Sequence, residues 1–232
     1  MIDQKVKDIP TKLKKRNLIV NEDKTERYTI KRNGPEEWKH CKYLGSHLDT
    51  EKDIARRKKL ANAALNKLRP VFKSNTVSTE VKCRLFEAYI SSIFLYNCEI
   101  WTLNKELEKE IDVFQRRLLR QILKVYYPRI ITNKYLYEKT KLQPWSTTAR
   151  FKRLKWLGHV FRLPRDSPAP TALREALVKV KKPKGGQIST WISIVQKQLI
   201  ELNVPDFEIA ETIAQNRNLW SSLIGRTMSS YE

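Results

Sequence analysis

The stretch NKELEKEIDVFQRRLLRQILK, from Asn104 to Lys124, shows the pattern that decides the fold. Its large apolar residues return every three or four positions, which places them on one side of an α-helix. Its acids come first and its bases last, an order that complements the helix macrodipole. The predicted buried stripe consists of Leu107, Ile111, Phe114, Leu118 and Ile122. The sequence therefore predicts an amphipathic helix whose outer side becomes basic toward its end.

Two more helices are predicted before this one. The first has a buried stripe made of Ile54, Ala61, Leu65, Leu68 and Phe72. The second begins with Ser78 as N-cap and Glu80 in its first turn, and continues to about residue 100. Because the second helix is apolar nearly all round, we expect it to be central and buried. Three helices with short links predict a compact bundle over residues 49–127.

The first 48 residues have a different residue pattern, with fewer helical features. A helix is followed by short β-prone runs, with turn-forming residues between or beside them. These runs are LIV (18–20), ERYTI (26–30) and CKYLGSHL (41–48). We expect a small α/β unit with a hairpin over residues 1–48, so that the fold class of the whole chain is mainly α.

After Pro128 the sequence again favours helices. A helix-turn-helix is predicted from TNKYLYEKT (132–140), a turn around KLQPW and the stretch ARFKRLKWLGHVFRLPR (149–165). A Pro-rich joint (164–170), a flexible basic link (179–187) and two final helices (190–203 and 205–224) follow. Residues 128–232 are therefore predicted to form a basic helical region.

Composition points to a polyanionic partner. The 46 Lys and Arg residues outnumber the 25 Asp and Glu residues, which leaves a net charge of +21. The bases recur along the whole chain and do not gather beside an apolar anchor, so nucleic acid is favoured over a membrane surface. The longest apolar run, AYISSIFLYNCEIW (88–101), is too short to cross a bilayer, and the N-terminus lacks the apolar core of a signal peptide.

The three cysteines show no CxxC spacing. This pattern predicts neither a disulfide framework nor a metal site, and no cysteine lies near His159 in sequence. We therefore expect a reduced, intracellular protein, nuclear or cytoplasmic.

Four blocks resemble, in the same order, the carboxyl-terminal part of reverse transcriptases of non-LTR (LINE-type) retrotransposons. The segment 13–30 is similar to the end of the palm with its motif D, and 41–68 resembles the primer-grip hairpin followed by the first thumb helix. The segment 84–123 resembles the remaining thumb helices, and RLKWLGHVFRLP (153–164) resembles the post-thumb R-W-x-G-H-x-x-R block. The resemblance implies the end of the palm over 1–48, the thumb over 49–127 and the region beyond the thumb over 128–232.

The chain departs from this family in two places. It contains no Asp-Asp pair, so the Y/F-x-D-D tetrapeptide is missing, and GGQISTW stands where relatives often carry Gly-Arg-Pro. Phosphoryl transfer by two metal ions needs clustered carboxylates. We therefore expect the chain alone to be inactive as an RNA-directed DNA polymerase and to need no cofactor, with Mg²⁺ implied only for the intact enzyme.

The resemblance also suggests roles for residues of the first unit. Lys24 matches the motif D lysine, which acts only within an intact palm. Tyr43, Leu44 and Gly45 match the primer grip, where glycine permits close approach of another backbone and tyrosine packs on a sugar. An ordinary hairpin would use the same residues.

Basic residues on two bundle helices are candidates for a groove that follows a nucleic acid through its phosphates. They are Arg56, Arg57, Lys58 and Lys59 on the first helix and Arg116, Arg117 and Arg120 on the third. A solvated charged face is the alternative reading of the same pattern.

The helix from residue 149 onward offers a second candidate surface. Phe151, Leu154, Leu157 and Phe161 form its predicted buried stripe. Phosphate contacts are predicted beside this stripe for Lys152, Lys155, His159 and Arg162. Trp156 is placed either to stack on an unpaired base or to pack against a neighbouring helix, and Gly158 allows a helix to approach closely.

The sequence leaves three functional hypotheses. The first is a thumb-like clamp that binds RNA or an RNA/DNA hybrid, with the rest of a polymerase as a further partner. The second is a stand-alone DNA-binding module acting through residues 132–162. The third is a relic without function, and the oligomeric state is not predicted.

Overall fold

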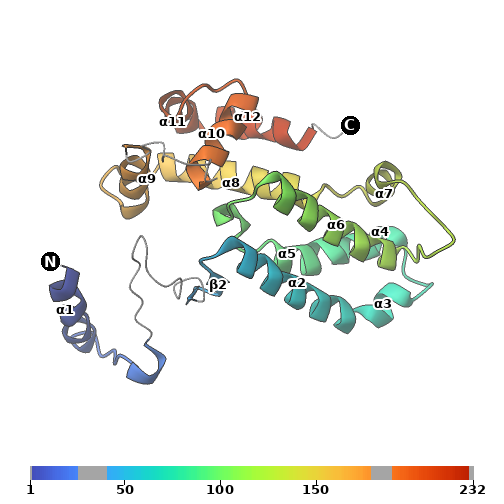
Figure 1. Cartoon of the computed structure of the whole chain (residues 1–232), viewed down its shortest axis with the longest axis horizontal. Helices are drawn as coiled ribbons and strands as arrows, with labels where there is room; N and C mark the ends of the chain where they lie inside the picture. The colour runs from blue at the N-terminus through green and yellow to red at the C-terminus, as the bar shows by residue number, and fades with distance from the viewer. Residues whose placement is uncertain (1, 26–40, 179–189, 230–232) are drawn as a thin grey trace. The chain divides into compact units, whose positions relative to one another are not determined.

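The computed structural model describes residues 2–25, 41–178 and 190–229 (Figure 1). The chain divides into two units, residues 1–48 and 49–232. The described part is mainly α, as predicted, and its only strands form one antiparallel pair. Among these residues, no helix combines the length and apolar character needed to span a bilayer. The strand predicted over 26–30 and the basic link 179–187 lie outside the described residues.

The first unit contains the predicted helix and hairpin. Its elements are α1 (Ile2–Lys14), the short helix η1 (Glu22–Lys24), β1 (Lys42–Tyr43) and β2 (Ser46–His47). Lys42 pairs with His47 and Tyr43 with Ser46. Both turn residues have positive φ, 47° for Leu44 and 81° for Gly45, as a two-residue hairpin turn of type I′ requires.

The strand predicted over residues 18–20 is wrong. These residues belong to no ladder in the described part of the chain, and Ile19 is 94% exposed. Their β-branched side chains favour a strand locally, but no neighbouring strand among the described residues accepts their backbone hydrogen bonds.

The second unit begins with a helical bundle. Its elements are α2 (Thr50–Lys67), α3 (Arg69–Lys73), α4 (Thr79–Leu85), the π-helical segment η3 (Phe86–Ser91), α5 (Ser92–Phe94), η4 (Cys98–Ile100) and α6 (Lys105–Ile122). The predicted apolar stripes face the core, although the helix predicted to carry the stripe through Phe72 is divided at Leu68 into α2 and α3. Asn104 caps α6 by accepting a hydrogen bond from the Leu107 amide at 2.8 Å, and Ser78 caps α4, as predicted.

Helix α4, segment η3 and helix α5 follow one another without a break and form one rod, residues 79–94. Phe86, Ile90 and Phe94 are fully buried along one side of the rod. Its other side is exposed, with Val81 50% and Tyr89 42% accessible. The prediction that this helix is buried nearly all round and continues to residue 100 is therefore wrong. The chain leaves the helix near Asn97, which has a left-handed backbone, and continues into η4.

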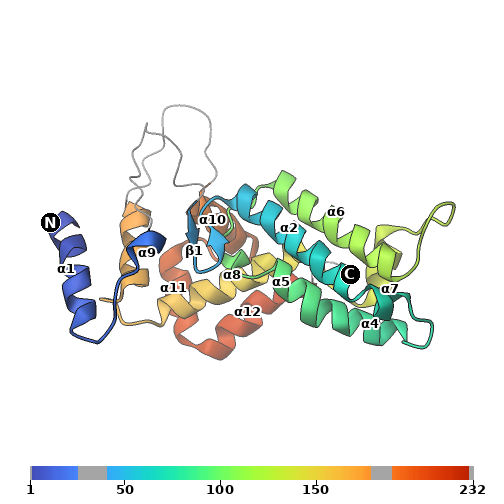
Figure 2. The same ribbon diagram turned by 90° about the horizontal axis from the view of Figure 1, so that it is seen from below.

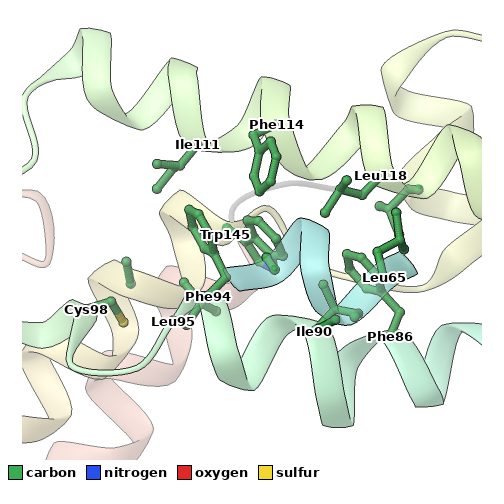
Figure 3. Packing of buried hydrophobic residues seen from close by; sticks show 14 of the residues in the cluster. Leu65, Phe86, Ile90, Phe94, Leu95, Cys98, Ile111, Phe114, Leu118 and Trp145 are labelled. Carbon is green, nitrogen blue, oxygen red and sulfur yellow. The ribbon is translucent and has the colours of Figure 1, made fainter. Parts of the chain in front are cut away.

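Trp145 lies at the centre of the first core (Figure 3). Its indole stacks on Phe94, with ring centroids 4.1 Å apart, and lies 5.8 Å from Phe86. Its Nε1 donates to the Ser91 hydroxyl at 3.0 Å, so the one polar atom of the ring is satisfied inside the core. The bundle core is therefore completed by a residue that lies beyond the three predicted helices.

The chain continues with α7 (Asn133–Thr140), α8 (Trp145–Phe161), α9 (Pro168–Val178), α10 (Trp191–Glu201), α11 (Phe207–Gln215) and α12 (Arg217–Ser229). Helices are present at both places where the helix-turn-helix was predicted, joined by a turn in which Lys141 has φ 55°. Helix α8 begins at Trp145, inside the predicted turn, and α7 packs on α4 and α6. The predicted Pro-rich joint is shorter than expected: residues 164–167 are non-helical, and α9 begins at Pro168, because prolines fit the first turn of a helix. The single helix predicted over 205–224 is two helices, separated at Asn216, whose side chain accepts hydrogen bonds from the amides that open α12.

Helix α8 joins two hydrophobic cores. Its first turns contribute Trp145 and Ala149 to the bundle core, and Leu154 and Leu157 belong to a second core with α10, α11 and α12. Helices α11 and α12 pack directly on α8 (Figure 2). Most of α8 is therefore enclosed by other helices.

Candidate nucleic-acid interface

The outer side of α6 gathers basic side chains. At about 100° per residue, the bases of α6 from position 109 to position 120 fall within an arc of roughly 100°. We call this set the α6 basic face, and it consists of Lys109, Arg116, Arg117 and Arg120 on the helix, together with Lys124, which lies just beyond the end of α6 and has φ 56°. Lys109, Arg117 and Lys124 are exposed, and Arg116 and Arg120 are half-buried. The predicted clustering of bases on α6 is thus present in three dimensions.

A base from α2 joins this face across the ring of Phe114. The Lys58 Nζ lies 5.6 Å from the centroid of Phe114, and the Arg117 guanidinium lies 5.2 Å from the same centroid. Lys58 also forms an ion pair with Glu110 of α6. Helices α2 and α6 therefore bring two cations to their shared seam, although Glu110 offsets one of them.

The other bases of the 56–59 run point elsewhere, because consecutive residues of a helix diverge by about 100°. Arg57 is 6% exposed; its Nε lies 3.6 Å from the buried Asp53 carboxylate and its guanidinium 4.6 Å from the Tyr96 ring centroid. Lys59 is exposed and Arg56 is half-buried. A groove that uses all four bases is therefore incompatible with the geometry, and Arg57 faces inward.

Arg120 holds a neighbouring loop. Its guanidinium donates to the Asn133 side chain at 2.7 Å and to the Ile131 carbonyl at 3.4 Å. It therefore ties α6 to the segment that precedes α7. Lys124 similarly donates to the Asn75 side chain. Within the α6 basic face, Lys109, Arg116 and Arg117 form no salt bridge among the described residues.

Of the four bases predicted beside the apolar stripe of α8, two bind backbone carbonyls and two are exposed to solvent. Lys152 donates to the Leu95 carbonyl at 3.4 Å, and Arg162 donates to the Ala214 carbonyl at 2.8 Å. Desolvation, together with the nearby Arg217, lowers the pKa of Arg162. Lys155 and His159 are exposed. The four side chains therefore do not form a continuous phosphate-binding stripe: two of them bind backbone carbonyls of this chain.

Trp156 packs against a neighbouring helix, one of its two predicted placements. Its ring meets Trp191 of α10 edge to face, with centroids 5.5 Å apart, and it remains 36% exposed. Trp191 is fixed in turn, because its Nε1 donates to the Glu99 carbonyl at 2.8 Å. The predicted close approach at Gly158 is also present, made by the indole of Trp220.

Two arginines of α8 have structural roles that the sequence reasoning missed. Arg150 forms two hydrogen bonds to the Glu108 carboxylate, at 3.0 and 2.9 Å, and one to Glu201 at 3.2 Å. Arg153 is fully buried and donates to the Trp101 carbonyl at 2.9 Å. Burial lowers the pKa of Arg153 to about 10. The first of these pairs joins residues 42 positions apart on different helices, so no local pattern in the sequence indicates it.

Polar side chains of α6 cap the N-terminus of α8. The Trp145 amide donates to Gln115 Oε1 at 2.9 Å, and the Ser146 amide donates to Asp112 Oδ1 at 2.9 Å. The Ser146 hydroxyl also donates to Asp112 Oδ2 at 2.6 Å. Burial raises the pKa of Asp112, and the hydrogen bonds from Ser146 offset part of this effect. These contacts lock the two helices together.

The candidates in the first unit lie at exposed positions. Tyr43 and Leu44 are 67% and 72% exposed at the hairpin turn, next to the exposed Gly45. Lys24 is exposed at the end of η1, where its amide donates to the Asn21 side chain at 3.1 Å.

Known proteins give no independent identification. No protein-family model, no curated protein and no solved structure matches the chain.

Proposed function

We propose that this chain binds RNA or an RNA/DNA hybrid through phosphates, with little dependence on base sequence. It would act as the thumb and post-thumb region of a LINE-type reverse transcriptase acts, clamping a template–primer duplex without polymerising by itself. The α6 basic face is the observation that carries the proposal. Exposed guanidinium and ammonium groups along one side of a rigid helix suit the regular spacing of phosphates.

The charge balance supports this choice. With a net charge of +21, the bases far outnumber the acids that can pair with them. Several acids of the second unit are already occupied by ion pairs, including Glu108, Glu110 and Glu211. The remaining positive charge attracts a polyanion over long range, and that attraction weakens as salt rises.

The helix-turn-helix alternative has less to support it. In a DNA-binding helix-turn-helix the second helix enters the major groove. Here that helix is α8, which is enclosed by α6, α10, α11 and α12. Its exposed polar side chains are few, with Lys155 and His159 among them. The proposed interface is therefore placed on α6 rather than on α8.

The test is a salt titration of binding to a fluorescently labelled RNA/DNA hybrid. The double variant Arg116→Gln/Arg117→Gln should weaken binding and lower the slope of log affinity against log salt by about two, one for each lost phosphate contact. Arg120 is left intact because it holds the loop before α7. The control Lys197→Gln/Arg217→Gln removes the same charge from exposed positions on α10 and α12.

A control variant that keeps the original slope, beside an α6 variant that loses two units, supports the proposal. Equal effects of the two double variants would mean that only total charge matters. In that case the assignment to α6 would be wrong. A marked preference for duplex DNA of one sequence would instead favour the DNA-binding module.

A further inference from the structure

A surface groove runs along the seam between α2 and the 79–94 rod and continues beside Tyr96. Its volume is about 430 Å³. Its lining includes Leu60, Ala64 and Lys67 of α2 and Tyr89, Ile93 and Tyr96 from the other side. We call it the Tyr89 groove. Pockets of this size hold small organic groups such as a nucleoside.

The groove combines an apolar floor with aromatic rings and cations. Tyr89 and Tyr96 are 42% and 45% exposed, so their rings are accessible to a ligand. Lys67, at the end of α2, is exposed beside them. Aromatic rings with neighbouring cations are the combination that binds unpaired nucleotides, because bases stack on the rings while phosphates bind the cations.

The ring of Tyr96 is oriented before any ligand arrives. The Arg57 guanidinium lies 4.6 Å from the centre of this ring and is itself held by Asp53. Asp53 is completely buried and also accepts a hydrogen bond from Trp101 Nε1 at 2.9 Å. This chain of contacts reaches from the bundle core to the groove. A fixed ring loses little conformational freedom when a base stacks on it.

The backbone of the rod is altered where it lines the groove. Tyr89 belongs to the π-helical segment Phe86–Ser91. The Ser92 hydroxyl lies 2.6 Å from the Ala88 carbonyl, to which it can donate, and 3.1 Å from the Tyr89 carbonyl. Short π-helical segments inside α-helices are rare and occur frequently at functional sites.

We infer that the Tyr89 groove binds a single-stranded nucleotide segment, with a base stacked on Tyr89 and a phosphate on Lys67. This inference rests on the proposed function and adds a second contact to it. The α6 basic face follows a backbone without regard to bases, whereas the groove requires an unpaired base. An acidic peptide would satisfy Lys67 but would leave the two tyrosine rings without a stacking partner.

The test compares three labelled probes on the full chain: an oligouridylate, an abasic strand of equal length and an RNA/DNA hybrid. Tyr89→Ala should lower the affinity for oligouridylate about fivefold to a hundredfold. It should leave the affinity for the abasic strand and the hybrid unchanged. Tyr89→Phe keeps the ring and should retain binding. Tyr135→Ala, at a tyrosine of α7 that is 46% exposed, is the matched control.

Two outcomes separate this inference from the proposed function. If the unaltered chain binds the hybrid but Tyr89→Ala does not weaken oligouridylate binding, the groove assignment alone is overturned. If the unaltered chain binds none of the three probes, both proposals fail.

Crosslinking gives a second readout that does not depend on a variant folding. A strand containing 5-iodouridine, irradiated on the unaltered chain, should attach to the peptide that carries Tyr89 or Tyr96. Attachment confined to α6 would overturn the groove assignment.

Discussion

The indole of Trp220 lies directly on the backbone of Gly158. Its Nε1 donates to the Leu154 carbonyl at 3.0 Å, and a Cβ added to Gly158 would lie 2.1 Å from that same nitrogen. The absence of a side chain at Gly158 is therefore what allows α12 to pack on α8. Trp220 is 2% exposed, so this contact is part of the second core.

The first prediction is that Gly158→Ala destabilises the second unit. The methyl group must displace the indole of Trp220, which breaks its hydrogen bond and loosens the packing. We expect the free energy of unfolding to fall by about 1–3 kcal/mol, measured by urea denaturation. The matched control is Gly225→Ala on α12, where nothing lies within 4 Å of the added Cβ. That change should stabilise the protein by up to about 1 kcal/mol, because alanine is the better helix former.

The second prediction concerns two arginines three residues apart on α8. Arg153 is fully buried, and its Nε and Nη1 find no hydrogen-bond acceptor among the described residues. Replacing it with methionine removes a poorly compensated buried charge. We expect the free energy of unfolding of Arg153→Met, measured by urea denaturation, to equal that of the unaltered chain or to exceed it by up to about 4 kcal/mol. Arg150→Met should instead cost about 1–3 kcal/mol, because it leaves the Glu108 carboxylate without its bidentate partner.

The stability difference between Arg153→Met and the unaltered chain should also depend on pH. The pKa of Arg153 is lowered by burial from 12.5 to about 10 in the folded protein. The charged form therefore penalises the folded state at all pH values below about 10, and the penalty disappears as the pH rises from about 10 toward 12.5. The advantage of Arg153→Met over the unaltered chain should shrink in that range. A constant difference between the two proteins across this range would contradict the assignment.

The third prediction uses Asp112, whose pKa is raised above its ordinary value of 3.8 by burial. A carboxyl with a raised folded pKa favours the folded state while it is protonated, and stability is lost as the pH rises through that pKa. Asp112→Asn cannot ionise, and its amide retains partners for Ser146. The free energy of unfolding of the unaltered chain, relative to Asp112→Asn, should therefore fall as the pH rises from 3.8 toward neutrality. A rise over this range would show that the Ser146 hydrogen bonds outweigh the desolvation.

The fourth prediction concerns the thiols. Cys83 and Cys98 are buried, and burial raises the pKa of Cys98 to about 12. A thiol that stays protonated inside a core reacts slowly with disulfide reagents. Cys41 is half-exposed. In native protein one of the three thiols should react with Ellman's reagent within minutes, and all three should react after denaturation. Prompt native reaction of Cys98 would mean that the bundle opens around it.

Local sequence signals predicted several elements that the structure contains. The apolar stripe of α6, the N-cap at Ser78 and the hairpin at 41–48 depend on residues a few positions apart, so they can be read without knowing the rest of the fold. The strand predicted over 18–20 failed because a strand needs a partner, and its own residues do not reveal whether one exists.

The sequence by itself determined where α2 and α6 lie, which of their sides are apolar and that bases accumulate on α6, because helical periodicity is a local property. Only the tertiary structure decided what the bases of α8 do. Arg150 meets Glu108, 42 positions away, and Arg153 meets the Trp101 carbonyl, 52 positions away. A charged side chain looks the same in sequence whether it faces solvent or a buried partner, since its role depends on which distant groups the packing of the helices brings within a few ångströms of it.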